Sequence, residues 1–144
     1  MKKKLLIMML LLIALCACST NELENVETVK ASYWIGNEEF PGEVVFDEYQ
    51  EVGVFINATT NAKELDDQKF IKTPPLLTYE LIGEGSNNKS FHLWITEDEE
   101  GFIQSLVPQD SQTYRLEEDT VKDLTNILKK QENTSLLTNI EFED

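Results

Sequence analysis

Apolar and polar residues alternate at five places along the chain, and each place predicts a β-strand. Between positions 29 and 36, apolar side chains occupy every second position, as a strand with one buried face requires. Four more strand-like runs follow one another across short segments rich in turn-forming residues, at positions 76–83, 90–96, 102–107 and 113–116. Short connections favour antiparallel neighbours, so these four runs predict a meander.

Two further stretches carry apolar residues at spacings of three and four, which predicts helices at positions 48–63 and 118–131. Asp47 and Gln50 predict a cap for the first helix, in which the Asp47 side chain accepts a hydrogen bond from the Gln50 amide. The second helix starts with acidic residues and ends with two lysines. That distribution of charge suits the helix dipole.

The order strand, helix, four strands, helix predicts a single domain of the α+β class. It would have an antiparallel four- to five-strand sheet with two amphipathic helices on one face. The chain has 144 residues, a length that suits one domain. Segments 37–43 and 64–75 contain prolines and are expected to be loops. Residues 132–144 form an acidic tail, and its few apolar residues predict weak docking.

The first residues have the pattern of a signal peptide. Three lysines precede fourteen apolar residues, which as a helix would rise about 21 Å, short of the roughly 30 Å of a bilayer core. The end of this segment, Leu15-Cys16-Ala17-Cys18, resembles the lipobox of bacterial lipoproteins. The resemblance implies removal of residues 1–17 and a lipid on the Cys18 thiol, with 18–28 as a tether. An uncleaved anchor, or a secreted protein cut after Ala17, remains an alternative.

The middle and the end of the chain resemble the YhfM-like domain. The matching features are Leu93-Trp94-Ile95, Tyr114-Arg115-Leu116 and a closing helix that ends Lys129-Lys130. The resemblance spans about positions 29–131. That family comprises small membrane-anchored proteins of Gram-positive bacteria with no established activity. The resemblance therefore implies an extracytoplasmic protein of similar fold on the cell membrane, and it supplies no catalytic signature.

The balance of charge excludes several partners. Twelve lysines and arginines against 27 acidic residues give a net charge of −15, and removal of a signal peptide with three lysines would take it to −18. Binding to nucleic acid relies on lysine and arginine contacts to phosphates, so nucleic acid is not an expected partner. A lipid on Cys18 would instead make the membrane the partner. The two cysteines lie close together near the start, which rules out a disulfide scaffold.

Candidate chemistry is sparse. One histidine, His92, cannot form a triad by itself, and no P-loop, GxSxG, HExxH or dinucleotide motif is present. We therefore expect no enzyme, no cofactor and no dedicated metal site. The acidic run offers oxygen ligands of the kind that calcium prefers, from Glu97, Asp98, Glu99 and Glu100. The other interpretation of this run is a charged hairpin turn.

Trp34, His92 and Trp94 form the candidate binding surface. Each lies on the strand face opposite the regular apolar row. Aromatic side chains exposed on an open sheet face are typical of a binding patch. Alternatively, the tail or a loop buries these faces.

Together these features predict a lipid-anchored extracytoplasmic protein with a non-catalytic binding or modulatory role. Its partner would be an envelope protein or a small ligand. A solute- or calcium-binding accessory lipoprotein is the second hypothesis, and a small hydrolase acting through carboxylates is the third.

Overall fold

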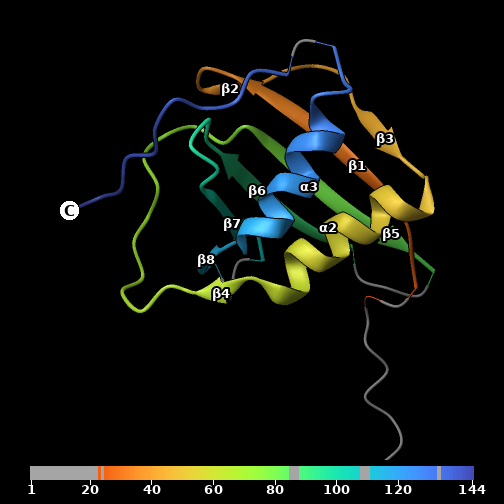
Figure 1. The fold of residues 1–144 in the computed structure, drawn as a ribbon, viewed down its shortest axis with the longest axis horizontal. Coiled ribbons are helices and arrows are strands. Elements are labelled where there is room, and N and C mark those ends of the chain that lie inside the picture. The colour runs from red at the N-terminus through yellow and green to blue at the C-terminus, as the bar shows by residue number, and fades with distance from the viewer. Residues whose placement is uncertain (1–22, 24, 85–87, 108–110, 133) are drawn as a thin grey trace, which may run out of the picture.

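An antiparallel sheet of eight strands forms the body of the domain in the computed structural model, which describes residues 23, 25–84, 88–107, 111–132 and 134–144 (Figure 1). Along the sheet the order is β2-β1-β5-β6-β7-β8-β4, and β3 pairs with β1 as well. The strands are β1 (Val26–Ile35), β2 (Glu38–Glu39), β3 (Val44–Phe46), β4 (Lys63–Glu64), β5 (Leu77–Gly83), β6 (Lys89–Ile95), β7 (Gly101–Ser105) and β8 (Thr113–Arg115).

The predicted fold class is wrong. We expected an α+β domain with an antiparallel four- to five-strand sheet and two amphipathic helices on one face, whereas the described chain is mostly sheet, with eight strands and two short helices. The three unexpected strands, β2, β3 and β4, have only two or three residues each. Alternation of apolar and polar residues cannot be recognised over so few positions. These three segments are strands because they pair with neighbouring strands of the sheet.

The predicted meander is confirmed. Strands β5, β6, β7 and β8 are consecutive antiparallel neighbours. Their registers align Tyr79 with Phe91, Leu93 with Ile103, and Ile103 with Tyr114. These side chains lie on the face of the sheet that the helices cover.

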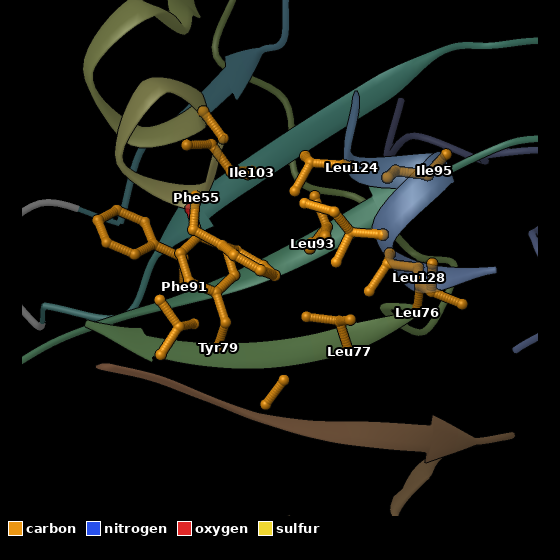
Figure 2. Packing of buried hydrophobic residues seen from close by; sticks show 14 of the residues in the cluster. Phe55, Leu76, Leu77, Tyr79, Phe91, Leu93, Ile95, Ile103, Leu124 and Leu128 are labelled. Carbon is orange, nitrogen blue, oxygen red and sulfur yellow. The ribbon is translucent and has the colours of Figure 1, made fainter. Parts of the chain in front are cut away.

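The helices α2 (Tyr49–Asn61) and α3 (Glu118–Leu128) run side by side across the sheet (Figure 1). Between them and the sheet lies an apolar core, in which Phe55, Tyr79, Leu93 and Leu124 are completely buried (Figure 2). The predicted cap is wrong, because α2 begins after Glu48 and no side chain caps its first turn. Neither described helix has the length and apolar character needed to cross a membrane.

Strand β1 begins at Val26, within the range expected to be a tether. It pairs along almost its whole length with β5, from Val26 to Tyr33. On its other side it pairs first with β3 and then, at Trp34 and Ile35, with β2. The two ends of β1 therefore have different neighbouring strands.

The C-terminal segment docks onto the domain through its backbone. Leu137 forms a parallel bridge with Thr96, and Phe142 an antiparallel bridge with Ile71. The Phe142 ring also meets the ring of Phe102 edge-on, with centroids 5.4 Å apart. The second face of the sheet is therefore partly covered by this segment and by the loop that carries Ile71.

Candidate functional site

The three aromatic residues singled out in the sequence lie next to one another on the sheet face away from the helices. The Trp34 indole N–H donates to the Thr78 hydroxyl over 2.9 Å, and that hydroxyl lies 2.9 Å from Nδ1 of His92. The His92 ring meets Trp34 and Trp94 edge-on, with centroids 5.5 Å and 5.8 Å apart. One continuous ladder of rings thus crosses from β1 to β6.

Only part of this ladder reaches solvent. Trp94 is 2% exposed, and its indole N–H donates to the Thr73 carbonyl over 2.8 Å. The loop that precedes β5 therefore covers it. Trp34 and His92 are half-buried. Burial lowers the pKa of His92, while the nearby Glu39 carboxylate acts in the opposite direction, so the imidazole is neutral at neutral pH.

A cleft of about 790 Å³ opens at the Ile35 end of β1. Trp34 forms part of its wall together with Tyr33, and apolar side chains from the neighbouring segments complete it. Ile35 and Phe40 are 67% and 52% exposed. Exposed large apolar side chains are costly in water unless something covers them, and this volume is typical of small-ligand sites.

The polar groups of the cleft come mainly from the segment that follows α3. Lys130 and Glu132 line the cleft, and Lys130 also lies 3.8 Å from the Glu51 carboxylate on α2. The Tyr33 hydroxyl accepts a hydrogen bond from Thr134 over 3.2 Å. Burial raises the pKa of Tyr33, so the phenol stays protonated. An apolar wall with a lysine and a phenol at its edge is suited to holding a ligand.

The acidic run forms the turn between β6 and β7. Glu99 adopts a left-handed conformation with φ of 63°, and the Glu100 amide donates to the Thr96 hydroxyl over 3.1 Å. The Glu100 carboxylate accepts a hydrogen bond from Arg115 over 3.0 Å. Glu97 and Asp98 are exposed. Within the described ranges no three acidic, histidine or cysteine side chains converge in a metal-binding arrangement.

Cys18, the predicted lipid attachment site, lies outside the described residues, as does the predicted signal peptide at positions 1–17. Most of the cleft was missed from the sequence, including Tyr33, Phe40, Leu76 and Lys130. Phe40 directly precedes Pro41-Gly42, in a segment expected to be a loop, where a large apolar side chain is not expected. This was the one feature of the sequence that pointed to the cleft.

The sheet, its two covering helices and the aromatic cleft define a small antiparallel-sheet domain with an apolar cleft on its surface. The chain belongs to the YhfM protein family, whose family model matches residues 27–134. No curated protein matches the chain, and no solved structure matches it. The docked segment after position 134 lies beyond the matched range.

Proposed function

We propose that this protein is a lipid-anchored extracytoplasmic binding module without catalytic activity. The lipobox pattern at Leu15-Cys16-Ala17-Cys18 supports the anchor, and the basic and apolar residues before it support export. Membership of the YhfM family is compatible with this role. Cys18 would attach the domain to the cell membrane, and the domain would meet its ligand or protein partner outside the cytoplasm.

The cleft at the Ile35 end of β1 is the observation that supports the binding role. Trp34, held in place by its bond to Thr78, offers a rigid indole wall, and Ile35 and Phe40 supply apolar surface at the entrance. Rigid aromatic side chains contribute large contact area at small entropic cost. The ligand would be mainly apolar, and a polar or anionic group on it would lie at Lys130.

A hydrophobic dye can test the cleft before the natural ligand is known. We expect the anionic dye anilinonaphthalene sulfonate to bind wild-type protein with a rise in fluorescence. Ile35→Asp and Phe40→Asp should abolish that rise, because each places a carboxylate at the entrance. Val45→Asp is the matched control, since Val45 is as exposed as Phe40, at 52%, and does not line the cleft. Equal dye binding by all variants would refute the cleft.

The anchor is tested separately with Cys18→Ala. The variant should leave the membrane fraction and lose incorporation of labelled palmitate. Retention of both by the variant would show that the chain is held at the membrane in another way.

A further inference from the structure

The outward face of α2 is almost devoid of charge in a strongly acidic protein. Charged residues make up 27% of the chain, yet the thirteen residues of α2 contain only Glu51. The Glu51 side chain is 22% exposed, and its carboxylate lies 3.8 Å from the Lys130 ammonium group, just after the end of α3. The single charge of α2 therefore points toward the end of α3, away from the helix's free side.

The free side of α2 borders a second groove, of about 640 Å³. Leu23 and Val26 form one wall, where the described chain begins, and Tyr49, Val54 and Ile56 from α2 contribute to the other. Each described residue that lines this groove is uncharged. A surface helix that faces water on its outer side normally carries charged residues there. Charge is depleted instead where a surface is covered by a partner.

The covalent chain limits what can cover this groove. Cys18 precedes Leu23 by five residues, which span at most about 18 Å when fully extended. If a lipid holds Cys18 in the bilayer, the groove cannot move far from the headgroups. A partner held this close acts at a high effective concentration, so even a weak contact forms most of the time.

We infer that the uncharged face of α2, together with Leu23 and Val26, docks on the surface of the bilayer that carries the lipid anchor. The inference rests on the proposed lipid at Cys18. Tyr49 is 91% exposed at the start of α2, and tyrosine is favoured at the membrane interface, where its ring is apolar and its hydroxyl is wet. The half-buried Val54 and Ile56 add apolar surface beside it.

Acidic residues next to the groove restrict which lipids favour docking. Glu27 follows Val26 and Glu48 precedes Tyr49 in the sequence, and both are exposed. Their carboxylates are repelled by anionic headgroups. Docking is therefore tighter on zwitterionic than on anionic membranes, opposite to the behaviour of a basic amphipathic helix.

Docking in this way directs the binding cleft away from the membrane. The groove lies at the Val26 end of β1 and the cleft at the Ile35 end. The nine steps between those residues cover about 30 Å at roughly 3.3 Å each. The ligand site then opens toward the outside.

The test uses the lipidated protein, purified from membranes and reconstituted in phosphatidylcholine vesicles that contain a headgroup quencher. The mature chain has no cysteine besides the lipidated Cys18, so Gln50→Cys gives one thiol for a fluorescent label beside the groove. Glu38→Cys is the matched control, because Glu38 is exposed in β2 and pairs with Ile35 at the far end of β1. We expect severalfold stronger quenching at position 50 than at position 38, and weaker quenching at position 50 when anionic lipid is added.

A charge placed in the groove should release the domain. In the Gln50→Cys background, Asn57→Glu should lower the quenching to the level of position 38, whereas Asn57→Gln should leave it unchanged. Asn57 is exposed, and the two substitutions lengthen its side chain equally and differ only in charge. Equal quenching at positions 50 and 38, with the lipid on Cys18 verified by mass spectrometry, would overturn the docking and leave the proposed anchor intact. If quenching at position 50 falls as more protein is placed on each vesicle, a second copy of the chain covers the groove. That result would overturn docking on lipid. Absence of the lipid from Cys18 would overturn both proposals.

Discussion

At the scale of single residues, position in a strand did not decide exposure. Trp34, His92 and Trp94 share one face of the sheet and touch in series, yet Trp94 is buried while the other two are half-buried. The difference comes from the loop that reaches Trp94 through Thr73. The loop covers the Trp94 end of this row of rings, whereas Trp34 and His92 at the other end stay half-buried.

Replacement of Trp94 should therefore affect stability far more than replacement of Trp34. We expect Trp94→Ala to lower the free energy of unfolding by about 3–5 kcal/mol, the usual cost of emptying a buried aromatic site. Trp34→Ala is the comparison, and its cost should be smaller because Trp34 is half-buried at the cleft. Urea denaturation measures both values. Similar losses for the two variants would contradict the difference in burial.

His92 gives the protein a dependence of stability on pH. Burial lowers its pKa in the folded state, so the unfolded chain, with a value of about 6.5, binds the proton more tightly. The free energy of unfolding is then largest above pH 6.5, where His92 is neutral in both states. It decreases as the pH falls from 6.5 toward the pKa of His92 in the folded protein. Urea midpoints at several pH values should show this loss in wild-type protein. His92→Gln should remove that component, and an unchanged pH profile in the variant would contradict it.

At the scale of elements, pairing between neighbours in sequence was predictable and pairing across the chain was not. The meander from β5 to β8 needs only short turns, so local alternation sufficed. Strand β4 pairs with β8, about fifty residues later, through Lys63 and Glu64 alone. The C-terminal segment likewise had too few apolar residues to predict its bridges to Thr96 and Ile71.

The contact between Phe142 and Phe102 should make the C-terminal segment part of the stable structure. We expect Phe142→Ala to cost about 1–2 kcal/mol of unfolding free energy, since an aromatic pair contributes roughly 0.5–1.5 kcal/mol beyond the area it buries. Phe70→Ala is a suitable control, because Phe70 lies in the adjoining loop and is 57% exposed. Thermal unfolding distinguishes the two. No change in Phe142→Ala would mean that the backbone bridges alone hold the segment.

At the scale of the whole molecule, net charge acts against folding. The sequence carries a net charge of −15, and the described ion pairs lie mostly at the exposed surface, as Lys122–Glu118 and Arg115–Glu100 do. Exposed pairs contribute little, so repulsion among the remaining carboxylates outweighs them.

Salt should therefore stabilise this protein. We expect the free energy of unfolding to rise with sodium chloride, with most of the rise complete by roughly 0.15 M, where the Debye length is about 8 Å. Urea titrations at several salt concentrations measure this. A steady rise continuing to high salt would indicate general exclusion of salt from the protein surface instead, and a fall would show that the ion pairs dominate.

The sequence by itself determined the meander, the closing helix and the family, because each depends on patterns within about ten to forty neighbouring residues. It also determined the charge, and it supplied the hypotheses of export and a lipid on Cys18. Only the tertiary structure decided the eight-stranded sheet, the burial of Trp94, the cleft beside Trp34 and the uncharged groove along α2. Each of these depends on which distant segments lie against a strand or a helix, and packing of the whole chain settles that choice.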